Sequence, residues 1–299
     1  MNNNNNIVSK LDSLSMIKPY KRALLIDLAA EKEKGVYMSS DCIPAFTSKF
    51  TFPYTSVNLK YLSFYYYDCE SVHDFGWGCA WRAIQTCLSY LLSRSSQLTS
   101  STDITFKNLF ITYGARSKLE ALYIKTYQPD NPNLPDYISN RNFCPFESMD
   151  GWAEPFIGKL IMSDYGFEGE LLLINSYNEK AYAPKEVFSR IITFPDFVEM
   201  VKEHFSKEDA SPIMIDDSIT ALCIGGIGKE ETDGDDSIRF IILDPHVRND
   251  KKGEQGIYYI IIEKNGEYKI SKNKQETILG GRLRFDTKGW MVFIPKNIK

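Results

Sequence analysis

The feature of this chain that most restricts its fold is a change of pattern along its length. The last third contains six short apolar or β-branched runs, most of them bounded by Gly, Asp or Asn: Pro212–Ile215, Ala221–Ile224, Ile238–Leu243, Ile257–Ile262, Tyr268–Ile270 and Trp290–Ile294. Such runs are typical of strands, and Asn265-Gly266 between two of them is a strong hairpin signal. Helical patterns precede these runs, and helices followed by adjacent strands indicate an α+β fold.

Three helices are predicted in the part of the chain that precedes these six runs. From Cys79 to about Arg94, apolar residues recur at three- and four-residue steps without an internal Pro or Gly, which predicts a helix that begins close to Cys79. Similar patterns predict helices over Trp152–Phe167 and Phe194–His204. The stretch between them from Ser95 to Glu147 contains three closely spaced prolines, and we interpret it as irregular.

The domain organisation follows from these patterns. Residues 1–55 include a run of asparagines after Met1 and are predicted to form a partly disordered N-terminal extension. Residues 56–299 are expected to form the main domain, with an insertion at about 95–147. A long loop in a compact domain is usually functional or disordered.

The composition indicates which class of binding partner and which cellular compartment are expected. The net charge of −4 argues against nucleic acid or an anionic membrane as the main partner. Six cysteines without a CxxC pair fit reduced thiols. We see neither a signal peptide nor an apolar run long enough to span a membrane. A cytoplasmic location is expected, with the nucleus or the surface of the endoplasmic reticulum as further locations.

Two short segments could together supply a nucleophile, a base and an orienting carboxylate. Cys79 follows the Gly76-Trp77-Gly78 turn at the start of a predicted helix, where backbone N–H groups and the helix dipole favour a thiolate. Asp244 and His246 stand two residues apart after an apolar strand, so that Asp244 could orient the imidazole. These are the parts of a cysteine hydrolase.

Simpler interpretations exist for each part. A cysteine at a helix start is often a small buried hydrophobe, and Asp-Pro-His after a strand is often only a turn. Of the other two histidines, His204 is expected to be solvated on a surface helix, and His73 could lie near the cleft. A zinc site at Cys69, His73 and Cys79 lacks a fourth ligand at suitable spacing, and no metal or cofactor is expected.

The segment around Cys79 resembles the signature of the proteases specific for the ubiquitin-fold modifier, peptidase family C78. The resemblance rests on the Gly-Trp-Gly-Cys turn, on Arg82, on Gln85-Thr86 and on the later Asp-Pro-His. It extends with gaps from about Tyr61 to Pro295. It implies a papain-like fold in which helices pack on a mainly antiparallel sheet and the catalytic cysteine lies at a helix N-terminus.

The same resemblance implies roles for individual residues. Cys79 would be the nucleophile, His246 the base and Asp244 the residue that orients it, while Tyr67 would donate its hydroxyl to the oxyanion. The residues expected to bind substrate are Trp77, Gly78 and Trp81. This chain departs from the family at Asp216-Asp217-Ser218, where glycines are common, and the departure could alter the wall of the cleft.

The implied activity is a thiol protease that cleaves after the C-terminal glycine of a ubiquitin-fold modifier, either to mature a precursor or to release the modifier from lysine. The expected partners are therefore that modifier and its conjugates. Three alternatives stay open: an autophagy-modifier protease, a deubiquitinase of the same fold, and an inactive module that only binds a modifier.

Overall fold

The computed structural model describes ten stretches of the chain: residues 54–58, 61–72, 74–95, 104–127, 152–175, 185–229, 237–246, 256–265, 267–270 and 289–296. The predicted N-terminal extension lies outside them, apart from its last two residues. Within these stretches the helices are α3 (Cys79–Arg94), α4 (Phe106–Tyr113), α5 (Arg116–Tyr127), α6 (Pro155–Asp164) and α7 (Phe194–Phe205), with short 3-10 turns η2 (Cys69–Ser71) and η5 (Lys185–Val187).

The described strands form one mixed, mainly antiparallel sheet. They are β1 (Tyr54–Ser56), β2 (Glu168–Ile174), β3 (Arg190–Ile192), β4 (Ile213–Asp216), β5 (Ala221–Gly228), β6 (Ile238–Leu243), β7 (Ile257–Asn265), β8 (Glu267–Ile270) and β9 (Trp290–Lys296). The order is β3-β2-β9-β4-β5-β6-β7-β8, and β1 pairs with β5. Only β2 and β3 are parallel within this sheet.

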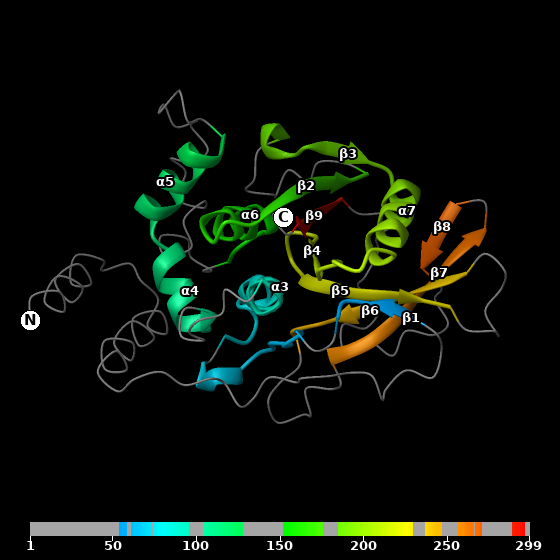
Figure 1. Ribbon diagram of the computed structural model, residues 1–299, viewed down its shortest axis with the longest axis horizontal. Coiled ribbons are helices and arrows are strands. Elements are labelled where there is room, and N and C mark those ends of the chain that lie inside the picture. The colour runs from blue at the N-terminus through cyan, green and yellow to red at the C-terminus, as the bar shows by residue number, and fades with distance from the viewer. Residues whose placement is uncertain are drawn as a thin grey trace, which may run out of the picture.

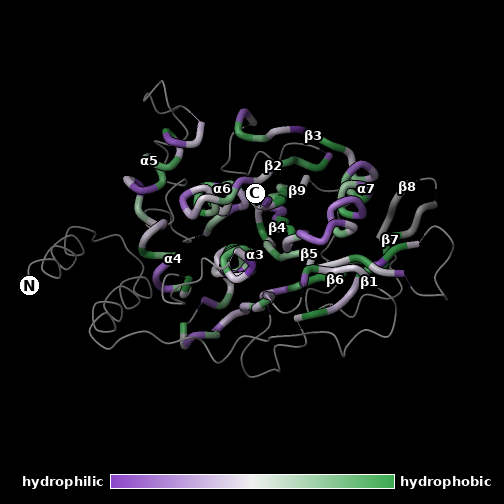
Figure 2. Tube along the Cα trace, viewed as in Figure 1, coloured by the Kyte–Doolittle hydropathy of each residue, from purple (hydrophilic) through white to green (hydrophobic). Residues whose placement is uncertain are grey.

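Helix α3 is the central helix of the fold. Figure 1 shows it end-on, grouped with α4, α5 and α6 on one side of the strands, while α7 lies on the other side. Nearly all of α3 from Ala80 to Leu92 is buried, as expected for a helix that is covered on all sides. Figure 2 shows hydrophobic residues along the central strands, including β4 and β9, against which these helices pack.

Local sequence explains where the other helices begin. The Thr105 side chain accepts a hydrogen bond from the Asn108 N–H at the start of α4, and Thr193 and Asp196 form a capping box at the start of α7. Helix α6 begins at Pro155, a favourable first residue because its missing N–H would have no helical partner. The residues at the starts of α4 and α7 are therefore of the types that commonly cap a helix N-terminus.

The predicted α+β class is confirmed, and so is the arrangement of helices on a mainly antiparallel sheet with Cys79 at a helix N-terminus. The bounds predicted for the first helix, Cys79 and Arg94, agree with α3. The predicted hairpin at Asn265-Gly266 corresponds to the antiparallel β7–β8 pair. None of the described helices has the length and apolarity needed to cross a membrane.

The prediction of an irregular stretch from 95 to 147 was wrong for its described part, since α4 and α5 lie there. The apolar residues of α4 recur at helical spacing and are buried. Their packing explains the helix: Phe106 and Phe110 lie in edge contact with Trp77, and Phe110 also contacts Trp81. The proline-rich part of the stretch lies outside the described residues.

Candidate active site

Cys79 is the first residue of α3, and Gly78 is its N-cap. The cysteine is partly exposed as a residue and lines a pocket. Gly78 provides no side-chain cap, and the first N–H groups of a helix have no intrahelical acceptor. The position therefore favours a negative charge on the sulfur.

Asp244 and His246 lie directly after β6 and form a hydrogen-bonded pair. His246 Nδ1 lies 2.6 Å from Asp244 Oδ1, and the His246 backbone N–H donates to the same oxygen at 3.0 Å. The other carboxylate oxygen accepts a hydrogen bond from the Tyr258 hydroxyl at 2.9 Å. Since the Asp244 side chain is fully buried and the His246 side chain is 14% exposed, the imidazole is held by a carboxylate that water does not reach.

Backbone hydrogen bonds hold this segment on both sides. The Asp244 N–H donates to the Gly256 carbonyl at 2.8 Å, and the Pro245 carbonyl accepts from the Tyr67 N–H at 2.9 Å. Tyr67 comes from the segment that precedes α3, so the second bond joins the two halves of the candidate site. The segments that carry the nucleophile and the base are thus in direct contact.

Tyr67 lies between His246 and the turn before Cys79. Its ring makes an edge contact with the His246 ring, with centroids 5.2 Å apart, and another with Phe75 at 5.4 Å. The residue is only 2% exposed, and burial, followed by the neighbouring Cys79, raises the pKa of its hydroxyl. The hydroxyl also hydrogen-bonds to Cys79, so it stays protonated and can donate toward the sulfur.

The electrostatics of Cys79 and His246 favour an ion pair. Burial alone would raise the pKa of Cys79, but the hydrogen bond and charge of His246, the Ala221 backbone N–H and the Tyr67 hydroxyl lower it on balance. Burial alone would lower the pKa of His246, but Asp244 and Cys79 raise it to about 10. A thiolate beside an imidazolium is the reactive form of a papain-type site.

A buried ionic network holds the turn that leads into α3. The Arg82 side chain is fully buried and donates to both Asp74 oxygens, at 2.8 and 3.1 Å, and to Glu70 at 2.7 Å. It also donates to the Cys69 carbonyl, and Gln85 donates to Glu70. The sequence analysis matched Arg82 and Gln85 to a motif but did not assign them this role. The signal that could have revealed the role is a basic residue three positions after Cys79 on a buried helix.

The glycines of the turn serve its internal geometry. A Cβ added at Gly78 would lie 2.2 Å from Asp74 Oδ2, whereas Gly76, at φ +83°, has nothing within 4 Å of such a carbon. Gly78 and Trp77 both donate backbone N–H groups to the Asp74 carbonyl. Gly78 is therefore required for the close approach of Asp74, and Gly76 for its left-handed backbone.

The two tryptophans near Cys79 have different surroundings. Trp77 is 9% exposed and lines a pocket beside Cys79. Trp81 has no exposed surface and packs edge-on against Phe110 in the core. This geometry does not support the expected substrate contact of Trp81, because its ring is covered by α4.

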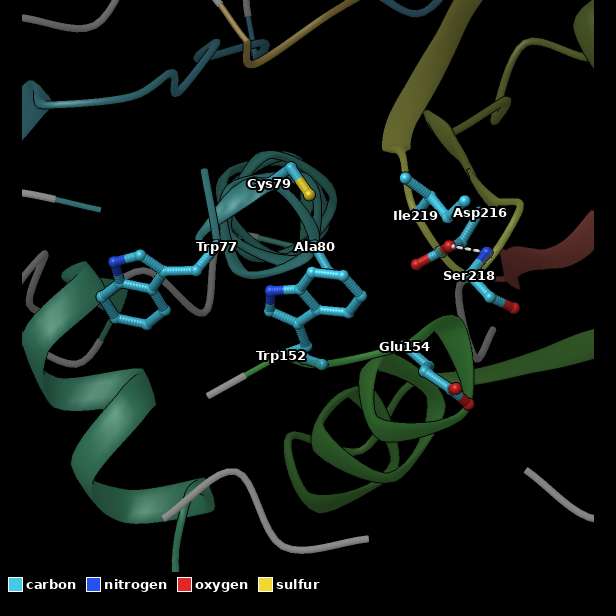
Figure 3. Close-up of a pocket in the computed structure, with 9 residues that line it drawn as sticks. Trp77, Cys79, Ala80, Trp152, Glu154, Asp216, Ser218 and Ile219 are labelled. Carbon is cyan, nitrogen blue, oxygen red and sulfur yellow. Dashed lines mark hydrogen bonds between the residues drawn. The ribbon is translucent and has the colours of Figure 1, made fainter. Parts of the chain in front are cut away.

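The pocket beside Cys79 is shown in Figure 3. It is lined by Trp77, Cys79, Ala80, Trp152, Ala153, Glu154, Asp216, Ser218 and Ile219. Its residues come from the turn before α3 and the first residues of α3, from the segment just before α6, and from the end of β4 and the loop that follows it. Sequence analysis noted Asp216 as a departure from a family pattern but did not predict that it, Glu154 or Trp152 would line a pocket with Cys79.

The sequence analysis also considered two further histidines, His204 and His73, and a zinc site. His204 was expected to be solvated, but its Nε2 lies 2.7 Å from the Ser211 carbonyl, and burial lowers its pKa. It therefore ties the end of α7 to the chain before β4. His73 lies outside the described residues. Within the described stretches no group of three or more His, Cys, Asp or Glu residues is arranged to hold a metal ion.

Residues 55–108 match the model of peptidase family C78. The match includes Tyr67, Cys79 and Arg82 and ends before Asp244 and His246. It confirms, for that part of the chain, the resemblance noted in the sequence. No curated protein matches this chain.

A crystal structure of UfSP from C. elegans is similar to this chain, with a TM-score of 0.48 and 16% sequence identity. The likeness covers 87% of this chain and 38% of the other. This chain thus spans well under half the length of that protein.

Proposed function

We propose that this chain is a cysteine peptidase that cleaves after the C-terminal glycine of a ubiquitin-fold modifier. In this proposal Cys79 is the nucleophile, His246 the general base and acid, Asp244 the residue that orients His246, and Tyr67 a donor to the oxyanion. The main domain spans 56–299, and the modifier and its conjugates are the partners.

The observation that carries the proposal is the hydrogen-bonded Asp244–His246 pair beside a cysteine at a helix N-terminus. The Asp244 bond at Nδ1 leaves Nε2 of His246 for Cys79. The contact between His246 and Cys79 lowers the pKa of the thiol and raises that of the imidazole. A structural cysteine would need no such partner, so the simpler interpretation of Cys79 as a small hydrophobe does not account for the pair.

The reaction that these groups support has two stages. The Cys79 thiolate attacks the carbonyl carbon of the glycine, and the electron pair of the C=O bond moves to the oxygen. The Tyr67 hydroxyl donates to that oxyanion. As the tetrahedral intermediate collapses, the C–N bond breaks and the amine takes a proton from His246. Neutral His246 then takes a proton from water, whose oxygen attacks the thioester and releases the modifier and Cys79.

The substrate class rests on the family match over residues 55–108. Glycine at the cleavage point suits a narrow approach, and Trp77 borders the pocket beside the sulfur. The leaving amine can be the α-amine of a precursor or the ε-amine of a lysine, since either accepts one proton. Maturation and deconjugation therefore use the same groups.

The proposal is tested with activity-based probes made from ubiquitin-fold modifier, ubiquitin and an autophagy modifier, each ending in a thiol-reactive electrophile. We expect the first probe to label the purified protein and the Cys79→Ala variant to remain unlabelled. Circular dichroism of the variant should match that of the unsubstituted protein, since Cys79 is not part of the core.

The other possible results of the probe experiment would change the proposal in different ways. Labelling by ubiquitin or the autophagy modifier alone would keep the chemistry and replace the substrate. Binding of a modifier without labelling would contradict catalysis and support a binding module. Labelling of Cys79→Ala would overturn the assignment of the nucleophile.

A further inference from the structure

The loop that follows Tyr67 contains two residues with a strained backbone. Asp68 has φ 60° and Glu70 has φ 61°, both in the left-handed region. Among the described residues other than glycine, only Asn175 and Ser218 also have a positive φ. This region is unfavourable for a residue with a Cβ, and it persists only where the surroundings enforce it. Contacts from outside the loop therefore hold its conformation.

The Glu70 carboxylate joins this loop to two helices. From α3, its Oε2 accepts hydrogen bonds from the Arg82 guanidinium at 2.7 Å and from the Gln85 amide at 3.0 Å. From the start of α4, the same oxygen accepts the backbone N–H of Phe106 at 3.1 Å. The Glu70 side chain is only 11% exposed. Because hydrogen bonds to an ionised group are strong, these donors fix the position of Glu70 against both helices.

Asp74, at the other end of the loop, contacts the backbone on both sides of the candidate site. Its side-chain Oδ1 accepts the N–H of Asp68 at 2.8 Å, and this N–H belongs to the peptide that follows Tyr67. Its backbone carbonyl accepts the N–H of Gly78 at 2.8 Å, directly before Cys79. Asp74 thus relates the backbone of the candidate oxyanion donor to that of the candidate nucleophile.

Arg82 connects the two carboxylates. Besides its bonds to Glu70 and Asp74, its Nη2 donates to the Cys69 carbonyl at 2.8 Å, which lies between the two strained residues. Arg82 has no exposed surface and lies in the first turn of α3, the helix that begins with Cys79. The strained loop is therefore tied to the helix that carries the nucleophile.

Tyr67 is held on both sides of its Cα. Its own N–H donates to the Pro245 carbonyl at 2.9 Å, and the next N–H along the chain donates to Asp74. Its hydroxyl hydrogen-bonds to Cys79. Because the hydroxyl is at the end of a rigid ring, a change in the backbone of the loop alters its distance from the sulfur.

We propose that Glu70 is a positioning residue for Tyr67: together with Asp74 and Arg82, it holds the strained loop so that the Tyr67 hydroxyl lies at Cys79. In this role the Glu70 carboxylate does not contact the substrate. Without its bonds the left-handed backbone would relax and carry the Tyr67 ring away. The inference rests on the proposed function, in which Tyr67 donates to the oxyanion.

A double-mutant cycle between Glu70 and Tyr67 tests this role. Glu70→Ala removes the carboxylate and keeps a Cβ in the left-handed region. We expect it to lower kcat for a modifier fusion by about 10²-fold with little change in KM, since a small misplacement of a catalytic group has such an effect. In the Tyr67→Phe background the same substitution should lower kcat by less than about threefold, because the hydroxyl that it positions is already absent. Glu70→Gln keeps an acceptor oxygen and should lie between Glu70→Ala and the unsubstituted protein.

A second measurement does not depend on cleavage of a modifier. Alkylation of Cys79 by iodoacetamide is followed as a function of pH by mass spectrometry of the peptide that contains it. The Tyr67 hydroxyl helps to lower the pKa of Cys79, so Tyr67→Phe should raise the midpoint of alkylation by up to about one pH unit and change its alkaline plateau little. Glu70→Ala should also raise the midpoint, and the double variant should show no further rise.

Asp68→Asn is the matched control. It removes a carboxylate from the same loop, asparagine adopts the left-handed backbone as readily as aspartate, and the backbone N–H can still donate to Asp74. We expect kcat within about twofold of the unsubstituted protein and the same alkylation midpoint. Circular dichroism monitors the fold of every variant, and Glu70→Gln replaces Glu70→Ala in both measurements if the alanine variant is unfolded.

Equal losses of kcat from Glu70→Ala with and without the Tyr67 hydroxyl, or an unchanged alkylation midpoint in Glu70→Ala, would overturn the inference. Midpoints that depend jointly on Glu70 and Tyr67, in a protein that neither cleaves a modifier fusion nor reacts with a modifier probe, would instead contradict the proposed function. They would leave the positioning of Tyr67 by Glu70 supported, so the two failures are distinguishable.

Discussion

His246 Nδ1 lies 2.6 Å from Asp244 Oδ1, and Tyr258 holds the second oxygen of that carboxylate at 2.9 Å. Asp244 thereby has donors on both oxygens while its side chain is fully buried. A carboxylate fixed in this way orients the imidazole and stabilises its protonated form. The candidate base is thus positioned by contacts that link β6 to β7.

Replacement of Asp244 tests this positioning. Asp244→Asn should lower kcat/KM for a modifier fusion by about 10³- to 10⁴-fold, since the imidazole loses its carboxylate partner. Tyr258→Phe removes only a donor to Asp244, so a loss of about tenfold is expected. Steady-state kinetics measure both variants. A Tyr258→Phe effect as large as that of Asp244→Asn would contradict an indirect role for Tyr258.

Tyr67→Phe removes the candidate oxyanion donor and keeps the ring that contacts His246. We expect kcat to fall by about 10²- to 10³-fold with little change in KM, because the hydroxyl acts on the transition state. Alkylation of Cys79 by iodoacetamide, which forms no oxyanion, should change much less. Equal losses in both reactions would indicate that Tyr67 acts on the thiolate instead.

The pH dependence follows from the two shifted groups. The pKa of Cys79 is lowered, so the thiolate should persist below the usual range of a thiol as pH falls. The pKa of His246 is raised to about 10, so the imidazolium that protonates the leaving amine is lost only as pH rises through about 10. A bell-shaped profile of kcat/KM is expected. In Asp244→Asn its alkaline limb should move to lower pH, and an unmoved limb would contradict the assignment.

Arg82→Met tests the network that holds the turn before α3. The substitution leaves the buried Asp74 carboxylate without its main partner, for which a loss of about 3–5 kcal/mol in the free energy of unfolding is expected. Urea unfolding measures it. Arg190→Met, which breaks an exposed pair with Glu170, is the control and should cost less than about 1 kcal/mol. Similar losses in both variants would contradict a special role for Arg82.

Gly78→Ala and Gly76→Ala separate close packing from backbone strain. At Gly78 the added carbon would overlap the Asp74 side chain, so the turn must shift and probe labelling of Cys79 should fall strongly. At Gly76 the added carbon meets open space, so only the left-handed backbone opposes it, at about 1 kcal/mol. Labelling rates and thermal unfolding distinguish the two variants. Normal labelling of Gly78→Ala would show that the turn tolerates the displacement.

The elements of this fold were predictable from the sequence where local pattern determines them. The Cys79–Arg94 helix was read with its observed bounds because apolar residues recur without an interruption, and the strands of the last third were marked by β-branched runs between turn residues. Helix α4 was missed although its spacing was helical, because nearby prolines suggested a loop for the whole stretch.

Contacts between residues far apart in the chain were decided only by the tertiary structure. The sequence by itself determined that Cys79 begins a helix and that Asp244 and His246 follow a strand, since both depend on neighbours in the chain. Packing decided that these segments meet through Tyr67 and Pro245, that Tyr258 completes the carboxylate, and that Trp81 belongs to the core. It also placed Asp216 and Cys79 in the lining of one pocket. The periodicity of a sequence indicates which face of a helix or strand is buried, but it does not indicate which other part of the chain covers that face.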